Sequence, residues 1–266
     1  MNDLLTIDPQ KEKKRIVSFL KETFAKQKID HAVIGLSGGI DSTTSFFLMK
    51  DVLPAKNIHV AHLYYFKPVF SEIEKVVKQA NIPQENIHLI SIKEPVDAIT
   101  DLQKIAITEA DKVRIGNIAA RVRMIILFDL AKKFDALVCG TENKSENLLS
   151  YFTRFGDQAA DIEPIEHLYK TQVYQLAVHL GVPEEIIKQS PTAGLWQGQT
   201  DEGEFGFTYE EADQVLYLHL EKNITVEELE KQGLKNASKI LAWRQKNLFK
   251  HNTPYVLQTQ STIIKL

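Results

Sequence analysis

Short apolar runs alternate with amphipathic segments over the first half of the chain. Runs rich in β-branched residues predict buried strands, and they lie at 33–36, 58–65, 87–92 and 135–140. Around them the apolar positions recur with the period of a helix, at 9–28, 43–49, 73–80 and 113–133. Strands that alternate with helices usually form a parallel sheet covered on both faces. The pattern therefore predicts an α/β fold with a doubly wound, Rossmann-like parallel sheet.

The other segments are less regular. Residues 94–112 predict a helix followed by a surface loop, and residues 191–207 are rich in glycine and predict a long mobile loop, which in a compact domain is usually functional. Further helices are expected at 172–180, 209–222, 226–232 and 236–249. We find no repeat and no linker, so we expect one domain over 1–266, with an N-terminal helix in 1–30, an α/β core in 31–190, the loop in 191–207, and C-terminal helices and a tail in 208–266.

Composition limits the classes of function. Hydrophobic residues make up 44% and charged residues 25% of the chain, as in an ordinary globular protein. The net charge of −3 gives no general affinity for nucleic acid. The N-terminus is charged and no apolar run approaches the length of a membrane span, so we expect no membrane association and a cytoplasmic location. The single cysteine, Cys139, excludes an internal disulfide.

A glycine-rich turn follows the first predicted strand, in the string Ser-Gly-Gly-Ile-Asp-Ser at 37–42. Gly38 and Gly39 allow the backbone to approach an anion, and the free N–H groups of the helix that follows favour negative charge. The turn is not a P-loop, because it lacks the lysine of that motif. Instead it carries Asp41, whose carboxylate would repel phosphates unless a divalent cation lay between them. The turn therefore predicts a phosphate site with Mg²⁺.

A second candidate segment follows the strand at 135–140 and runs from Thr141 to Glu146. In an open parallel sheet the ligand crevice lies beyond the carboxyl ends of the strands, so this segment is expected beside the glycine-rich turn. Glu146 is then a candidate for the second carboxylate on Mg²⁺. The alternative is that Glu146 is an acid at a helix start that only complements the helix dipole.

Other reactive side chains have plainer interpretations. His59, His62 and His88 lie in or beside predicted strands without a carboxylate at ligand spacing, which favours core or edge histidines over a metal site. Cys139 lies inside a strand, as a buried small residue does. Arg121 and Arg123 project about 200° apart on a helix, so they cannot share one patch.

Taken together, five motifs in order between residues 30 and 215 resemble the NAD synthetases of the ATP-pyrophosphatase superfamily. They are Gly-Leu-Ser-Gly-Gly-Ile-Asp-Ser (35–42), Gly-Asn-Ile-Ala-Ala-Arg-Val-Arg-Met (116–124), Gly-Thr-Glu-Asn-Lys-Ser-Glu (140–146), Tyr-Phe-Thr-Arg-Phe-Gly-Asp (151–157) and Pro-Thr-Ala-Gly-Leu-Trp-Gln-Gly-Gln-Thr-Asp-Glu (191–202). The first motif alone is shared with GMP synthetase and its relatives. The resemblance implies a sheet of the adenine nucleotide alpha-hydrolase type with C-terminal helices.

The resemblance also implies a reaction: ATP adenylates the nicotinate carboxyl of deamido-NAD, pyrophosphate leaves, and ammonia displaces AMP to give NAD. By position, the implied catalytic residues are Asp41, Glu146 and Lys170, and the metal ligands for Mg²⁺ are Asp41 and Glu146. The implied ATP contacts are Gly35, Leu36, Ser37, Gly38, Gly39, Ile40, Asp41, Ser42, Thr141, Lys170 and Thr192. The implied deamido-NAD contacts are Arg121, Arg154, Asp161 and Lys250. The family works as a homodimer with the dinucleotide across the interface, so a homodimer is expected here.

Two positions depart from the family pattern. Arg154 stands where lysine is common, which keeps the charge but changes the donor geometry. Near the C-terminus the family commonly shows His-Lys-Arg, whereas this chain reads Phe249-Lys250-His251. Lys250 keeps the expected phosphate contact.

The nitrogen donor is expected to be free ammonia. Relatives that use glutamine carry an extra domain with a catalytic cysteine, whereas here about thirty residues precede the first strand and Cys139 lies in a core strand. Two other functions stay open: another adenylating amidotransferase or tRNA-modifying ATP pyrophosphatase, which would need a different acceptor segment, and a nucleotide-binding regulator without turnover. The acidic pair Asp41 and Glu146 argues against the regulator.

Overall fold

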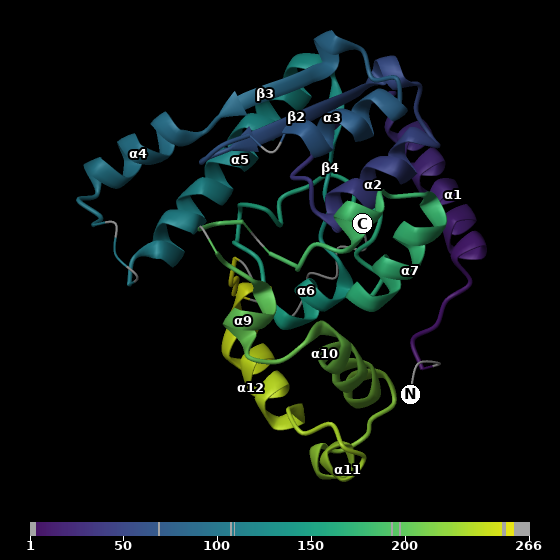
Figure 1. Cartoon of the computed structure of the whole chain (residues 1–266), viewed down its shortest axis with the longest axis vertical. Coiled ribbons are helices and arrows are strands. Elements are labelled where there is room, and N and C mark those ends of the chain that lie inside the picture. The colour runs from purple at the N-terminus through teal and green to yellow at the C-terminus, as the bar shows by residue number, and fades with distance from the viewer. Residues whose placement is uncertain are drawn as a thin grey trace.

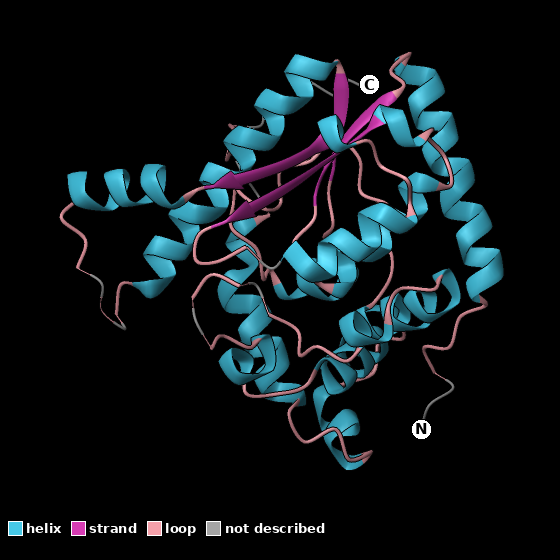
Figure 2. Ribbon diagram, turned by 45° about the horizontal axis from the view of Figure 1, so that its top comes forward, coloured by secondary structure: helices cyan, strands magenta, loops and turns pink. Residues whose placement is uncertain are grey.

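The computed structural model describes residues 4–68, 70–106, 108, 110–192, 194–196, 198–251 and 254–257. Four parallel strands form one sheet in the order β3-β2-β1-β4 (Figures 1 and 2). Their bounds are β1 His31–Gly35, β2 Ile58–Tyr64, β3 Ile87–Ser91 and β4 Ala136–Cys139. The predicted α/β fold with a doubly wound parallel sheet is confirmed.

Two apolar layers enclose the sheet, because alternate side chains of each strand point to opposite faces. The first layer packs against α1 (Pro9–Gln27), α2 (Ile40–Lys50), α3 (Phe70–Gln79) and α7 (Lys170–Leu180). The second packs against α4 (Lys93–Leu102) and α5 (Lys112–Phe134). In β1, for example, Ile34 belongs to the first layer and Val33 to the second. This burial on both faces explains why the strands read as unbroken apolar runs.

The C-terminal helices form a third apolar core beside α6 (Lys144–Leu149). They are α9 (Asp201–Phe205), α10 (Tyr209–Leu216), α11 (Val226–Lys231) and α12 (Ala237–Asn247). A π-helical turn extends α10, and short helical turns complete the set at Ala55–Asn57, Gln84–Asn86, Glu184–Ile187 (α8) and Leu248–Lys250. Figure 1 shows this group on the opposite side of α6 and α7 from the sheet. Among the described residues, no helix has the length and apolar character needed to cross a membrane.

The sheet order reverses between two neighbouring strands. β1 pairs with β2 on one edge and with β4 on the other, and Ile34 lies opposite Cys139 in the β1–β4 register. β2 follows β1 in the chain and lies on one side of it, whereas β4 lies on the other side. The connections after β1 and β4 therefore run in opposite directions and leave a crevice beyond the carboxyl ends of these two strands. The segments that begin at Leu36 and at Gly140 therefore start side by side.

Several boundaries differ from the sequence-based expectations, and three of them bear on the site. The predicted loop at 191–207 contains α9, whose N-cap Thr200 accepts a hydrogen bond from Gly203 N, so the segment is not irregular throughout. The helix expected from Thr43 begins at Ile40, because Gly39 is its N-cap. The helix expected over 209–222 changes to π-helical geometry after Leu216. Residues 193 and 197 of the predicted loop lie outside the described residues.

Candidate active site

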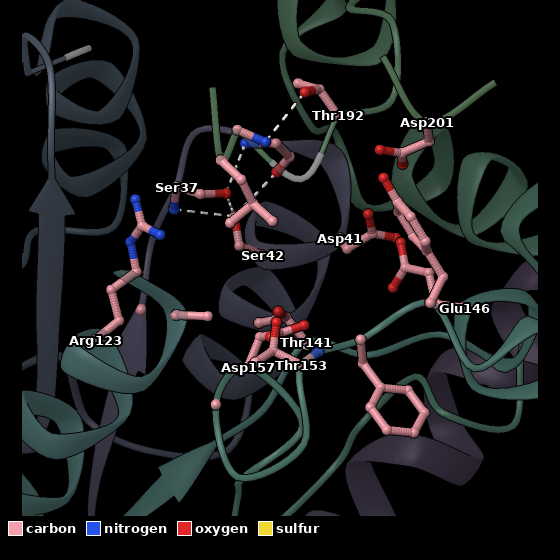
Figure 3. A pocket seen from close by; sticks show the side chains of 18 of the residues that line it. Ser37, Asp41, Ser42, Arg123, Thr141, Glu146, Thr153, Asp157, Thr192 and Asp201 are labelled. Atoms are coloured by element: carbon pink, nitrogen blue, oxygen red, sulfur yellow. Dashed lines mark hydrogen bonds between the residues drawn. The ribbon is translucent and has the colours of Figure 1, made fainter. Parts of the chain in front are cut away.

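A cavity of about 860 Å³ opens at the carboxyl ends of β1, β2 and β4 (Figure 3). Its walls come from the glycine-rich turn and from the loop after β4. They also come from residues 150–153, 156 and 157, and from residues 189–192, 194–196, 198 and 199. This is the place that the reversal of strand order predicts for a ligand. All eight residues from Gly35 to Ser42 line it, as do Thr141, Glu146, Lys170 and Thr192.

Hydrogen bonds of its own hydroxyl groups stabilise the turn between β1 and α2. Gly38 has φ 92°, a conformation that favours glycine. The hydroxyls of Ser37 and Ser42 lie 3.0 Å apart, and Thr43 Oγ1 donates to Gly39 O at 2.9 Å. The first turn of α2 therefore faces the cavity with its free N–H groups and with Asp41, a geometry suited to an anion paired with a cation.

A lysine joins two carboxylates in the wall of the cavity. Lys170 Nζ donates to Asp41 Oδ2 at 2.5 Å and to Glu146 Oε1 at 3.3 Å. The Lys170 side chain is 2% exposed, whereas those of Asp41 and Glu146 are 17% and 18% exposed. We call Asp41, Glu146 and Lys170 the acid–lysine cluster. Figure 3 shows the two carboxylates side by side with Asp201 beyond them.

Glu146 lies at a helix start, as one of the two interpretations predicted, and it also lines the cavity. Its Oε2 accepts from Asn143 N at 3.3 Å while Asn143 Oδ1 accepts from Glu146 N at 3.0 Å, which is a capping box at the start of α6. Its other oxygen, Oε1, faces Lys170. Asn143 also donates through Nδ2 to Asp41 Oδ1 at 3.1 Å. Asn143 therefore fixes the position of the Asp41 carboxylate relative to that of Glu146.

Burial and charge act in opposite directions on the cluster. Burial raises the pKa of Glu146 to about 8, and the nearby charges of Asp41 and Asp201 add to this while Lys170 opposes it. For Lys170, burial disfavours the ammonium form, but the carboxylates Asp41 and Glu146 outweigh burial and raise its pKa. The lysine is therefore protonated at neutral pH.

The donor set fits Mg²⁺ better than a transition metal. No group of three or more His, Cys, Asp or Glu side chains among the described residues is arranged to hold a metal ion by itself. Asp41 and Glu146 together offer two carboxylates at the edge of a cavity, and Mg²⁺ is commonly bound by one or two carboxylates with substrate phosphates and water. The site suits a metal that arrives with a phosphate ligand.

Three of the four residues expected to contact deamido-NAD lie outside the cavity lining. Arg121 is exposed and donates through Nε to Arg154 O at 3.3 Å, the Arg154 guanidinium lies 5.2 Å from the centre of the Phe249 ring, and Asp161 Oδ2 accepts from Val138 N at 2.8 Å. Lys250 does line the cavity and donates to the carbonyls of Ser150 and Phe152, both at 2.9 Å.

Several residues line the cavity without having been singled out as site residues, among them Arg123, Thr153, Asp157 and Asp201. Arg123 donates through Nε to Leu63 O at 3.0 Å, and burial lowers its pKa. The sequence established that Arg121 and Arg123 face different ways, but it could not say which one faces inward. Asp201 is 3% exposed and accepts from Tyr209 at 3.1 Å. In the sequence Asp201 lies in the predicted loop at 191–207, and nothing there marked it as a site residue.

Comparisons with known proteins agree over nearly the whole chain. Residues 12–254 match the family model described as NAD synthase. A Fusobacterium nucleatum protein named NH(3)-dependent NAD(+) synthetase is 44% identical over 222 residues, covering 82% of this chain and 83% of that one. A Thermoplasma volcanium protein of the same name is 39% identical over 250 residues, covering 94% and 98%.

Solved structures give the same picture. The NH3-dependent NAD synthetase from Campylobacter jejuni has a TM-score of 0.76 and 31% identity, covering 95% of this chain and all 100% of that one. The NMN synthetase from Francisella tularensis has a TM-score of 0.78 and 30% identity, covering 97% and 100%.

The sheet order, the glycine-rich turn and the acid–lysine cluster define a parallel α/β protein with a ligand cavity at its switch point. The family match over residues 12–254 makes this assignment specific. The chain belongs to the NAD synthase family.

Proposed function

We propose that this chain joins ammonia to the nicotinate carboxyl of deamido-NAD at the expense of ATP, giving NAD, AMP and pyrophosphate. As a member of its family the chain is a ligase that forms a C–N bond. The observation that carries the proposal is the acid–lysine cluster, which lies directly beside the glycine-rich turn at 37–42. A nucleotide-binding regulator would not need two carboxylates and a buried lysine at that place.

The proposed chemistry has two steps. First a carboxylate oxygen of deamido-NAD attacks the α phosphorus of ATP, the bond between the α and β phosphates breaks, and pyrophosphate leaves. Then the nitrogen of ammonia attacks the adenylated carbonyl carbon, the bond to AMP breaks, and the nitrogen releases one proton to solvent as the amide forms. An attacking carboxylate and a triphosphate repel each other, so we expect the protein to act by alignment and by neutralising charge.

The described residues divide this work. Ser37 to Ser42 would hold the phosphates through backbone N–H groups and hydroxyls. Lys170 would stabilise the negative charge that builds up on the leaving pyrophosphate, and Asp41 and Glu146 would be the ligands of Mg²⁺. When bound, Mg²⁺ would supply further positive charge to the phosphate oxygens.

The residues outside the cavity lining bear on the second substrate. Arg121 on α5 is exposed and donates to the backbone of Arg154, which is half-buried, and Asp161 is exposed. We propose that they bind deamido-NAD where a second copy of the chain covers this surface, with Lys250 on the cavity side. The exposed apolar side chains of Val113 and Ile125 on α5, 47% and 59% exposed, support a homodimer that buries this helix.

We also propose a cytoplasmic location. Cys139 is a free thiol that is 2% exposed in a core strand, and burial raises its pKa. A chain with one unpaired buried thiol suits a reducing compartment.

The test is pyrophosphate release from purified protein with ATP, Mg²⁺ and ammonium chloride. Deamido-NAD should support turnover, and the rate should rise from pH 7 to pH 8.5 as more of the ammonium is free ammonia. Because one solved relative is named an NMN synthetase, nicotinate mononucleotide is the matched alternative substrate. Turnover on the mononucleotide but not on the dinucleotide would reassign the substrate. Efficient turnover on glutamine in the absence of ammonium would overturn the assignment of the nitrogen donor.

A further inference from the structure

A buried carboxylate lies behind the cavity, on a helix that follows the site motifs in the sequence. Asp213, on α10, is 0% exposed. It accepts hydrogen bonds from the hydroxyl of Ser145, from Thr171 N at 2.9 Å and from Thr171 Oγ1 at 2.8 Å. It does not line the cavity, so it cannot touch a substrate held there.

Its partners are the direct neighbours of two members of the acid–lysine cluster. Ser145 precedes Glu146 on α6, and Thr171 follows Lys170 on α7. A further hydrogen bond closes the arrangement, because Lys170 N donates to Ser145 Oγ at 2.7 Å while the Ser145 hydroxyl donates to Asp213. One side chain therefore connects the first turns of both helices.

This connection sets a distance that matters in the cavity. Lys170 Nζ and Glu146 Oε1 lie 3.3 Å apart, on side chains that start from two different helices. α6 is only six residues long and is held at its start by Asn143, so its orientation depends on contacts with its neighbours. A displacement of about 1 Å in a catalytic group can lower a rate by about 100-fold.

We propose that Asp213 is a positioning residue, which fixes Glu146 and Lys170 relative to each other through Ser145 and Thr171; the inference rests on the function proposed above. The negative charge of Asp213 also favours the ammonium form of Lys170. Burial raises the pKa of Asp213 to about 6, while its hydrogen bonds with Ser145 and Thr171 oppose that shift. The carboxylate is therefore mainly ionised at neutral pH.

The same helix offers a matched control. Glu211 accepts from Asn236 N at 2.9 Å and from Asn236 Nδ2 at 2.6 Å, and so ties α10 to the start of α12. It does not line the cavity. Glu211→Gln should weaken the packing of α10 as Asp213→Asn does, without changing the two helix starts that carry the cluster.

The experiment compares steady-state kinetics of the two variants with deamido-NAD, ATP, Mg²⁺ and ammonium. We expect Asp213→Asn to lower kcat by about 10- to 100-fold, because the cluster is misaligned, and to raise the Mg²⁺ concentration needed for half-maximal activity. KM for ATP should change less than about threefold, since the phosphate turn is untouched. Glu211→Gln should keep kcat and the Mg²⁺ dependence within about threefold of wild type.

A double-mutant cycle separates positioning from general packing. Ser145→Ala should lower kcat alone but add little to Asp213→Asn, because both remove one network. Combined with Glu211→Gln, Ser145→Ala should have an additive effect. If Asp213→Asn does not fold, Ser145→Ala and Thr171→Val replace it, and at least one must lower kcat with KM for ATP unchanged.

Two results would overturn the inference in an active wild-type enzyme: an unchanged kcat in Asp213→Asn, or equal losses in Asp213→Asn and Glu211→Gln. A wild-type protein that releases no pyrophosphate with any acid substrate would instead refute the proposed function.

Discussion

Lys170 holds a positive charge where water hardly reaches. Its side chain is 2% exposed, and its ammonium group pairs with Asp41 and Glu146. Removal of one member of a buried ion pair leaves the remaining charges uncompensated, which costs about 3 to 5 kcal/mol. The residue is therefore expected to stabilise the fold as well as to act in the reaction.

We predict that Lys170→Met abolishes adenylation and destabilises the protein. Without the ammonium group, the Asp41 carboxylate loses its ion-pair partner in a place that water hardly reaches, so the free energy of unfolding should fall by about 3 kcal/mol. Urea titration and pyrophosphate release measure the two effects. The matched control is Lys188→Met, which removes the exposed ion pair between Lys188 and Glu184 at α8. This variant should lower the free energy of unfolding by less than about 1 kcal/mol. Equal stability of the two variants would contradict the prediction.

His59 makes stability depend on pH. Its ring lies between those of His31 and His88, with ring nitrogens 3.4 Å apart on both sides, and it stacks on Phe134 with 3.8 Å between ring centres. Burial, the charges of His88 and His31 and that of Lys133 lower its pKa to about 4. The folded protein therefore binds this proton less tightly than the unfolded chain, in which a histidine pKa is about 6.5.

The contribution of neutral His59 to the free energy of unfolding is therefore complete above pH 6.5 and is lost as the pH falls toward 4. We predict that the free energy of unfolding of the wild type falls between pH 7 and pH 5, and that the fall is smaller in His59→Gln. Urea titrations at the two pH values measure it. An identical pH slope in the variant would show that other groups are responsible.

At the scale of elements, long periodic segments were predicted well. The sequence placed all four strands and the helices α1, α3 and α5 within a few residues of their observed bounds. It missed α6 and α9, because helices of six and five residues are too short to show a period. These two carry Glu146 and Asp201, so their capping residues, rather than their apolar pattern, define them.

The site was predictable to the extent that it is local. The turn at 37–42 and its acid Asp41 could be interpreted from the order of residues alone, and the end of β4 followed from the rule for parallel sheets. Lys170 came only from the family resemblance, since a lysine at a helix start has no pattern of its own. Asp213 could not be found at all, because its role depends on which helices pack together.

Gly140 illustrates how tightly the end of β4 is packed. A Cβ atom at Gly140 would lie 1.8 Å from Glu163 Oε1, and Glu163 Oε2 accepts from Glu142 N at 3.2 Å. Burial raises the pKa of Glu163 to about 9, so this side chain is mainly uncharged at neutral pH. The carboxyl group fills the space that a side chain at residue 140 would need.

We predict that Gly140→Ala lowers the free energy of unfolding by about 1 to 3 kcal/mol through overpacking. The double variant Gly140→Ala/Glu163→Ala should be more stable than Gly140→Ala, since it removes the clashing carboxyl group. Urea denaturation curves of both variants provide the measurement. A double variant less stable than the single one would mean that the hydrogen bond to Glu142 outweighs the clash.

At the scale of the whole molecule, an arm of two helices projects from the body. α4 and the first turns of α5 extend to one side of the sheet in Figures 1 and 2. Leu102 at the end of α4 is 79% exposed, and Ile125 on α5 is 59% exposed. Exposed apolar side chains on neighbouring helices are typical of surfaces that a partner covers.

We predict a homodimer at micromolar concentration and a shift toward monomer in Ile125→Glu, because the variant would bury a charge in the interface. Sedimentation equilibrium measures the mass. Turnover of deamido-NAD should fall in parallel with the dimer fraction. A wild-type monomer with full activity would refute both the dimer and the substrate site placed at its surface.

The acid–lysine cluster also affects the order in which parts of the molecule fold. Lys170 and Asp41 are 129 positions apart in the chain, and Asn143 and Asp41 are 102 positions apart. The cluster therefore forms only when α2, α6 and α7 have packed together. Contacts between distant positions form late in folding, because long loops must close first. During refolding from urea, helical circular dichroism should therefore recover before enzymatic activity, and the last kinetic phase should be the one in which pyrophosphate release returns. Stopped-flow dichroism and activity sampled at the same refolding times would show whether the site is the last part of the molecule to form.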